Sequence, residues 1–524
     1  MQDSLRDSYE AAPYESNTIP TTQIGSLQAV AMLHGMRATP ADRSRVLELG
    51  CASGGNLIPM AYRYPHSEFL GVDFADNQIQ DGLREIQNLG ATNIELKTMS
   101  ITDIDDSYGQ FDYIICHGVY SWVPPDVQDA ILRVCSRNLS PNGVAYISYN
   151  VYPGWRQREL LRDALMFHDD RSLPPIARVA RARDFAKGLA LAAPRPTTVY
   201  EAILADESRA AVAQGAAHLF HEQLEPYNAP VYFAEFAARA AGHGLRFVSE
   251  SKVWLSGWQS EPFVRETLGD SGADPIRTQQ YIDFVRGRTF RMTLLCHDTI
   301  PVHSAPSAAA IPELFFVGTC TQETPSAEDA AKGDDVVAFR SREVTVTTTN
   351  NPIMIGAMRA LARVTPRTLS YRELESQVKQ RVAVSDVPGL PGGAQGDDEV
   401  SRTLPEILLE CARGALIDVE AIPSPIVTKV SARPRASAAG RVRAAGRLTI
   451  PTLIHGRVTI GAPERFVLSR LDGSRTVADL AAELLSATER GEVTFEGPSV
   501  TAETAAKAVS DMLNFFASCA LLEA

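Results

Sequence analysis

An apolar strand that runs directly into a glycine-rich turn is the most constraining feature of this 524-residue chain: residues 45–56 read RVLELGCASGGN. Residues 46–49 predict a strand, and residues 56–64 predict a helix that opens after Gly54 and Gly55. Glycines at such a junction let ligand atoms approach the backbone. Glu48 stands two residues before Gly50, where a carboxylate suits a cationic amino-acid end better than a pyrophosphate. The turn alone still leaves open a junction that binds nothing.

Three further strands repeat the arrangement of a strand that ends in a polar residue. Residues 68–73 predict a second strand ending in Asp73, 23 residues after Gly50, and a carboxylate at that tip can accept both ribose hydroxyls. The third strand, 93–97, leads to Ser100 and Ile101, a polar and an apolar residue able to bracket an adenine. The fourth, 111–116, ends at His117. A helix at 125–139 and a turn at 140–143 then precede a fifth strand at 144–149.

The ordered series ELGCASGGN, GVDFADNQ, SITDI, FDYIICHGVYSWVP and SPNGVAYISYN resembles the motifs of class I S-adenosylmethionine (SAM)-dependent methyltransferases. The resemblance implies SAM as the cofactor, with Glu48 and Gly50 facing its methionine end, Asp73 on the ribose, and Ser100 and Ile101 beside the adenine. Ala52 departs from the family's G-x-G-x-G pattern, and we expect a slightly fuller turn that still binds SAM. The cofactor-binding set that the resemblance implies is Tyr14, Glu48, Gly50, Ala52, Gly54, Asn56, Asp73, Phe74, Gln78, Ser100, Ile101 and His117.

The sheet resumes after a long interruption. A helix at 231–241 and strands at 245–249 and 288–296, the last one antiparallel, complete the expected seven strands. Residues 155–230 are therefore predicted to be a helical insertion. Its basic residues fit either an ordinary solvated helix face or a surface that docks an acidic or extended substrate; they are Arg156, Arg158, Arg162, Arg178, Arg181, Arg183 and Lys187.

Two segments narrow the resemblance. HEQLEPYNAPVYF (221–233) and QQYIDFVRGRTFRMTLLCH (279–297) are similar to the methyltransferase regulatory domain of bacterial protein lysine methyltransferases that act on outer-membrane proteins. Residues 8–22 are similar to the opening segment of those enzymes, which implies an N-terminal arm, 1–30, with Tyr9 and Tyr14 as candidates for a lid. The predicted methyltransferase core spans residues 1–297.

The residues after the fourth and fifth strands suit transfer to a lysine amine, which must lose a proton before its lone pair can attack. His117, Tyr120, Trp122 and Tyr152 are the predicted catalytic residues, with His117 as a proton relay because an imidazole titrates near neutrality. His117 could equally be structural, and Tyr120 and Trp122 could belong to the core. The chain lacks the Asn/Asp-Pro-Pro-aromatic stretch typical of enzymes that methylate adenine or amide nitrogens, which argues against those acceptors.

The second half of the chain predicts two smaller α+β units. The expected fold class is an α/β, Rossmann-like seven-stranded methyltransferase sheet with a helical insertion, followed by two winged-helix-like domains. The middle domain is expected at 298–425, and a C-terminal domain at 426–524 begins with a low-complexity basic stretch, 432–446, interpreted as a surface linker.

Charge and composition exclude several classes of function. A net charge of −13 argues against nucleic acid as a partner. The seven cysteines lie far apart without a CxxC pair, which indicates reduced thiols and no metal site. The chain contains no run of 18 or more apolar residues that would predict a membrane-spanning helix, so a cytoplasmic protein is expected. The leading hypothesis is a methyltransferase of protein lysines; a homodimer, a small-molecule methyltransferase and a non-catalytic SAM-binding scaffold remain open.

Overall fold

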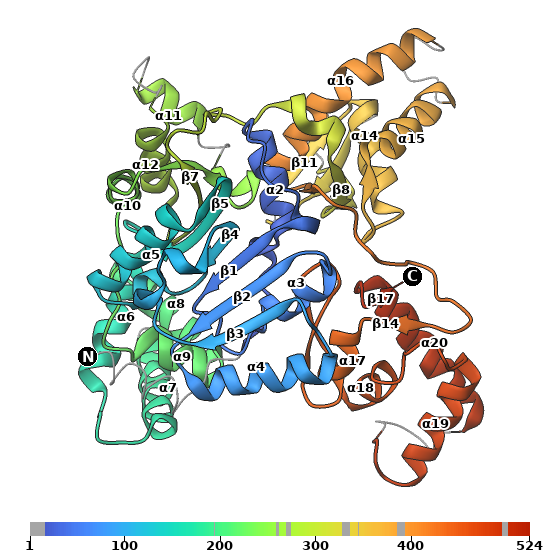
Figure 1. Cartoon of the computed structure of the whole chain (residues 1–524), viewed down its shortest axis with the longest axis horizontal. Helices are drawn as coiled ribbons and strands as arrows, with labels where there is room; N and C mark the ends of the chain where they lie inside the picture. Colours follow the sequence, from blue (N-terminus) through green and yellow to red (C-terminus); the bar gives the residue numbers. More distant parts are fainter. Residues whose placement is uncertain are drawn as a thin grey trace.

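The computed structural model describes residues 16–192, 194–257, 261–268, 274–326, 336–343, 345–384, 394–494 and 501–523. Its centre is a seven-stranded sheet in the order β3-β2-β1-β4-β5-β7-β6 (Figure 1). All neighbours are parallel except β7, which runs antiparallel to β5 and β6. The seven-stranded prediction is confirmed. The strands are β1 (Arg45–Leu49), β2 (Glu68–Asp73), β3 (Ile94–Thr98), β4 (Phe111–Cys116), β5 (Leu139–Asn150), β6 (Leu245–Glu250) and β7 (Phe290–His297).

The fifth strand begins earlier than the sequence predicts. Residues 140–143, predicted as a turn, belong to β5, and Leu139 already pairs with Phe111 of β4. The register then shifts between Phe111 and Tyr113, which absorbs the extra residues as a bulge. The proline and glycine of this segment predict a break in regular strand pairing, and in the structure this break is the bulge within β5.

Alternating side chains of these strands fill two hydrophobic layers. Val46, Tyr113 and Tyr146 point to one face with α2 (Ile24–Leu33), α3 (Leu57–Arg63) and α4 (Asp76–Leu89). Leu47, Ile114 and the neighbouring strand residues point to the other face, which α5 (Pro125–Arg137) and α10 (Phe233–Gly242) cover. The period of two along buried strands explains why both faces are apolar.

The insertion is helical, as predicted, and has its own small core. Its arginines are only partly a solvated face, because Arg162 and Arg183 donate to the carbonyls of Glu222 and Gln214 and Arg178 binds Asp169. Its helices are α6 (Trp155–His168), α7 (Pro175–Ala192), α8 (Val199–Ala213) and α9 (Ala216–Gln223), and α11 (Glu261–Leu268) and α12 (Pro275–Arg286) follow between β6 and β7.

Much of the predicted N-terminal arm is buried structure. Residues 24–33 form α2, which packs between the sheet and the middle domain (Figure 1). Ile24, Leu27 and Val30 are fully buried there. Residues 24–30 of the predicted lid arm, 1–30, therefore belong to the buried core; Tyr9 and Tyr14 lie outside the described residues.

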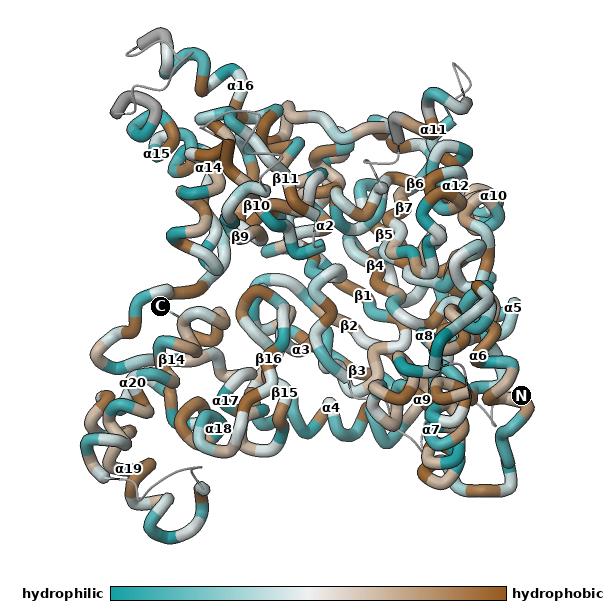
Figure 2. Tube along the Cα trace, turned by 180° about the vertical axis from the view of Figure 1, so that it is seen from behind, coloured by the Kyte–Doolittle hydropathy of each residue, from teal (hydrophilic) through white to brown (hydrophobic). Residues whose placement is uncertain are grey.

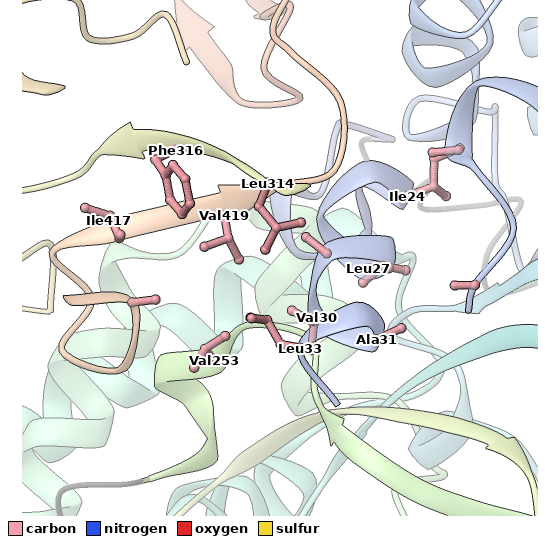
Figure 3. Close-up of a cluster of buried hydrophobic side chains, with 14 of the residues drawn as sticks. Ile24, Leu27, Val30, Ala31, Leu33, Val253, Leu314, Phe316, Ile417 and Val419 are labelled. Carbon is pink, nitrogen blue, oxygen red and sulfur yellow. The ribbon is translucent and has the colours of Figure 1, made fainter. Parts of the chain in front are cut away.

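The middle domain shares this core. Figure 3 shows Leu314, Phe316 and Val419 of the middle domain packed toward Val30 and Leu33 of α2. Three-stranded sheets, β12-β8-β13 and β11-β10-β9, pack with three helices. The elements are β8 (Phe315–Gly318), β9 (Thr321–Glu323), β10 (Val337–Arg340), β11 (Val346–Thr349), β12 (Leu369–Ser370), β13 (Ile417–Glu420), α14 (Pro352–Ala362), α15 (Tyr371–Val384) and α16 (Ala394–Arg413).

The C-terminal domain has a separate core and rests on α3 and α4, as α17 shows in Figure 2. The stretch predicted as a linker contains β14 and α17 and buries Arg443, so that prediction is wrong. None of the described helices is long and apolar enough to cross a membrane. The elements are β14 (Arg435–Ala436), α17 (Ala438–Ala444), β15 (Thr449–Pro451), β16 (Arg457–Thr459), α18 (Ala462–Leu468), α19 (Val477–Glu489), α20 (Ala502–Ser518) and β17 (Leu522–Glu523).

Candidate cofactor and methyl-transfer site

The predicted cofactor residues gather at one edge of the sheet. The parallel strands β1 to β5 all end there, and Glu48, Asp73 and His117 stand at or just beyond the ends of β1, β2 and β4. Ligands of doubly wound sheets bind in the crevice outside these carboxyl ends. Chain topology therefore brings together residues that are far apart in sequence.

The glycine-rich turn adopts the left-handed backbone that its sequence suggests. Gly50, Ala52 and Gly54 have φ of 74°, 49° and 70°. The N–H groups of Gly50 and Cys51 both donate to the carbonyl of Val72, which ties the turn to β2. Because Ala52 carries a Cβ, its left-handed conformation costs about 1 kcal/mol or more, whereas glycine adopts this conformation freely. Its methyl group makes this turn strained as well as fuller.

Glu48 is a buried carboxylate with one oxygen left for a ligand. Its Oε1 accepts a hydrogen bond of 2.7 Å from Nδ2 of Asn56, while its Oε2 has no hydrogen-bond partner among the described residues. Burial raises the pKa of Glu48 to about 8, and the charge of Asp73 adds to the rise. A buried carboxylate without a cation is costly, so the site fits a ligand that brings a positive group. The ammonium of SAM is such a group.

Asp73, the predicted ribose ligand, organises the glycine-rich turn. Its Oδ2 accepts the N–H of Ala52 at 2.8 Å, and its Oδ1 accepts the N–H of Ala75 at 2.9 Å. Burial raises the pKa of this carboxyl from its ordinary value, against the lowering effect of these backbone donors. Each oxygen keeps a lone pair for a hydroxyl donor.

Asp73→Asn is expected to weaken SAM binding by about 1–2 kcal/mol. The substitution removes the negative charge and replaces one accepting oxygen with an NH₂ group, which can only donate. Calorimetric titration with SAM measures the loss. Asp81→Asn is the matched control, since Asp81 lies on α4 with an exposed side chain paired to Arg84. Equal affinity of Asp73→Asn and the wild type would refute the ribose assignment.

The remaining predicted cofactor residues in the described part of the chain follow β2 and β3. Ser100 caps a short 3-10 helix that contains Ile101, which is largely buried. Gln78 is buried in the first turn of α4, and Phe74 directly follows Asp73. Their contacts with a cofactor stay predictions, as does that of Tyr14, which lies outside the described residues.

His117 is held by hydroxyl groups. Its Nδ1 lies 2.8 Å from the hydroxyl oxygen of Tyr146 and 3.2 Å from that of Ser148. Burial lowers the pKa of His117 to about 4, so the premise that it titrates near neutrality is wrong. A neutral ring with so low a pKa is a weak base at pH 7, which favours a positioning role over a proton relay.

The three predicted aromatic catalytic residues each pack against other side chains. Tyr120 is fully buried on the α5 side of the sheet, where it packs against the stacked rings of Tyr149 and Phe236. Trp122 is buried and packs edge-on to another tryptophan. Tyr152 donates its hydroxyl to Glu159 at 2.6 Å. Their packing supplies a structural role for each, and their catalytic roles stay predictions.

A cavity of about 350 Å³ lies between the start of β7 and the middle domain. Phe290 belongs to its wall, pairs with Asn150 at the end of β5, and packs edge-on against His117 at 6.0 Å between ring centroids. The cavity thus adjoins the edge where the cofactor residues gather. Its walls are Trp254, Leu255, Arg286, Gly287, Arg288, Thr289 and Phe290 from the core, and Glu343, Thr345, Arg413, Gly414 and Ala415 from the middle domain.

Sequence analysis missed two contributors to the cofactor edge. Ser16 accepts the N–H of Gly55 with its hydroxyl oxygen, and His455 of the C-terminal domain reaches Asn56. Gly55 offered a signal, because a Cβ there would stand 2.2 Å from the Ser16 carbonyl oxygen. For His455 no signal existed, since nothing in a sequence links positions 399 residues apart.

Three family sequence models match the chain. They are a methyltransferase domain at residues 47–145, a predicted methyltransferase regulatory domain at 215–297, and the PKMT (protein lysine methyltransferase) C-terminal winged helix domain at 432–521. Their order agrees with the fold, and the last one begins within the stretch that composition had assigned to a linker.

Two curated relatives and a solved structure from Rickettsia are similar to this chain. The uncharacterized protein RP789 of Rickettsia prowazekii (strain Madrid E) is 36% identical over 381 residues, 71% of this chain and 68% of the relative. RP028 of the same strain is 37% identical over 233 residues, 44% of this chain and 93% of the relative. The structure of PKMT2 from Rickettsia typhi has a TM-score of 0.83 at 25% identity, and its complex with AdoHcy has 0.81 at 26%; each comparison covers 97% of this chain and 100% of PKMT2. The chain therefore belongs to the class I SAM-dependent methyltransferases that combine a methyltransferase regulatory domain with a PKMT-type C-terminal winged helix domain.

Proposed function

We propose that this SAM-dependent methyltransferase transfers methyl groups to lysine side chains of an extended protein segment, which binds in the cavity between β7 and the middle domain. The observation that carries the proposal is the shared wall of this cavity: Phe290, beside His117, on one side and Thr345 of the middle domain on the other. A polypeptide that enters this cavity can contact both the core and the middle domain, which supports a protein acceptor. The likeness to PKMT2 supports the same acceptor.

Different residues of the chain would bind different parts of the cofactor and the acceptor. Glu48 and Asp73 would hold the ammonium and the ribose of SAM, whose sulfonium supplies the activated methyl group. The rest is positioning and desolvation, because the acceptor needs only to lose a proton and approach in line. A lysine amine entering this partly buried region loses its proton more readily, since burial and a nearby cation both lower an amine pKa.

The charge of the cavity wall indicates what flanks the acceptor lysine. Arg286, Arg288 and Arg413 stand against the single carboxylate of Glu343. Arg288 is already paired with Asp283, and Arg413 with Glu410. Arg286 and Glu343 are exposed, so the cavity opens to the surface. We propose an acceptor segment with acidic residues near the lysine, and an outer-membrane protein as its class.

The experiment is transfer of labelled methyl groups from SAM into fractionated host extract, followed by mass-spectrometric mapping of labelled residues. Label on lysines of a protein band supports the proposal. Label confined to small molecules would establish the metabolite enzyme instead, and SAM binding without any label would favour the scaffold. Fractionation of cells and size-exclusion chromatography test the cytoplasmic location and the homodimer, which also stay predictions.

Thr345→Trp is expected to lower methylation of the protein acceptor at least tenfold while leaving SAM affinity unchanged. The indole would fill the cavity from the middle-domain side. A loss of about 1.4 kcal/mol of binding free energy is enough for a tenfold effect. Val346→Trp is the matched control, since the neighbouring Val346 is 42% exposed and is not part of the cavity wall. Undiminished protein methylation by Thr345→Trp would place the acceptor elsewhere.

A further inference from the structure

The C-terminal domain reaches the cofactor edge through one buried side chain. His455 lies in the turn between β15 and β16 and is 2% exposed. Its Nε2 lies 2.7 Å from Oδ1 of Asn56, in the glycine-rich turn of the methyltransferase domain. Asn56 in turn contacts Glu48. A continuous path of polar contacts therefore runs from the C-terminal domain to the carboxylate that fits the cofactor's ammonium.

The direction of each hydrogen bond on this path is determined. The backbone N–H of Ile19 can only donate, so the Asn56 atom at 2.9 Å from it is the amide oxygen. The opposite end of the amide donates to Oε1 of Glu48 at 2.7 Å. Nε2 of His455 faces the amide oxygen and must carry the hydrogen. The path thus consists of two donated bonds in series, both oriented toward Glu48.

The ring of His455 donates as a neutral group. Burial lowers the pKa of His455 to about 3, and the cations Arg63, Arg443 and Lys252 lower it further. Its backbone has φ of 62°, a left-handed conformation that costs free energy for any residue with a Cβ. A strained backbone in a buried turn persists only where surrounding contacts determine it.

Those contacts flank His455 on both sides. The hydroxyl of Thr18 donates to the carbonyl of Gly456 at 2.7 Å, and Nη1 of Arg63 donates to the carbonyl of Leu453 at 3.3 Å. Nearby, Nε of Arg443 lies 2.6 Å from Oε1 of Glu85, an ion pair with both side chains buried. The N-terminal segment, α3 and α4 together fix the turn that presents His455.

We propose that His455 is a positioning residue of the cofactor site: its hydrogen bond to Asn56 holds the carboxylate of Glu48, so that docking of the C-terminal domain and binding of the methionine end of the cofactor favour each other. The inference rests on the assignment of SAM to this edge. Coupling between two binding events is reciprocal, so the cofactor also strengthens the attachment of the domain.

The test compares two ligands that differ only where Glu48 acts. S-adenosylhomocysteine carries the amino-acid end, and 5′-methylthioadenosine lacks it. His455→Gly suits the left-handed backbone and removes the donor, so we expect the fold to persist while affinity for S-adenosylhomocysteine falls about tenfold, the effect of one buried hydrogen bond. Affinity for 5′-methylthioadenosine should stay unchanged. His455→Gln, which keeps an N–H donor at similar reach, should restore most of the binding.

The controls separate positioning from general loosening. In a Glu48→Gln background, His455→Gly should cost no further affinity for S-adenosylhomocysteine. His66→Gly, at an exposed histidine, should change neither affinity. Equal losses for both ligands, or additive losses in the double variant, would overturn the proposal. A wild-type protein that binds neither ligand would overturn the SAM assignment itself, and this inference with it.

Discussion

Glu48→Gln is expected to weaken SAM binding roughly 10- to 100-fold, the worth of a charge-assisted hydrogen bond of about 1.5–3 kcal/mol. Glutamine keeps the oxygen that accepts from Nδ2 of Asn56, so the local geometry is retained. It loses the negative charge on the oxygen that has no partner among the described residues. Affinity should therefore fall without loss of the fold.

The same substitution is expected to stabilise the cofactor-free protein at alkaline pH. Burial raises the pKa of Glu48 from 4.5 to about 8, so between these values the folded protein binds a proton that the unfolded chain has released. Stability must then fall as pH rises through this window. Glutamine does not titrate, so the variant lacks the pH dependence of stability that Glu48 causes. Burial also raises the pKa of Asp73, and the pH dependence that Asp73 causes remains in both proteins.

Thermal denaturation of both proteins from pH 5 to pH 9 measures the stability effect. The wild type should lose more stability than Glu48→Gln as the pH rises. Calorimetry at pH 7 in two buffers of different ionisation enthalpy measures protons: the wild type should release up to one proton from Glu48 on binding SAM, and the variant none. Parallel stability profiles together with equal proton release would show that Glu48 is not the ammonium site.

The sequence predicted the sheet well because its signals are local. Most strands of the methyltransferase core contain a short apolar run, and residues such as Gly50, Asp73 and His117 mark strand ends where parallel topology brings them together. The low-complexity segment was predicted wrongly for a physical reason. The alanines and arginines at 432–446 are a composition that suits a solvated linker and a short helix equally, and only the contact of Arg443 with Glu85 distinguishes them.

The cofactor edge was predictable to the extent that it is built from these strand ends. The residues that support this edge from behind could not be predicted. Ser16 and His455 come from outside the parallel strands and reach the edge only through tertiary packing. Protonation states also escaped prediction: the near-neutral pKa expected of His117 ignores burial, which the sequence does not reveal. The residues best recognised by pattern are thus those at the strand ends, and the residues that hold them in place were missed.

Arg443→Met is expected to destabilise the docking of the C-terminal domain by about 3–5 kcal/mol, the effect of removing one partner from a buried ion pair. Glu85 of α4 would remain largely buried without its cation, and the carbonyl of Gly55 would lose the contact from Nη2 of Arg443. Hydrogen–deuterium exchange should rise both in α17 and in residues 50–56. Because His455 belongs to the same domain, affinity for S-adenosylhomocysteine should fall in parallel.

Two further variants identify the cause of this loss. Arg443→Met combined with Glu85→Leu removes both charges and should recover much of the docking, since an apolar pair of similar volume often replaces a buried ion pair at little cost. Arg475→Met breaks partly exposed ion pairs with Glu483 and Asp472 in the same domain, and water screens both pairs, so its effect should stay near or below about 1 kcal/mol. If the double variant exchanged as fast as Arg443→Met alone, the arginine would act by filling space. Recovery of exchange protection and of S-adenosylhomocysteine affinity together would instead show that the ion pair fixes the domain, and that the fixed domain supports the cofactor site.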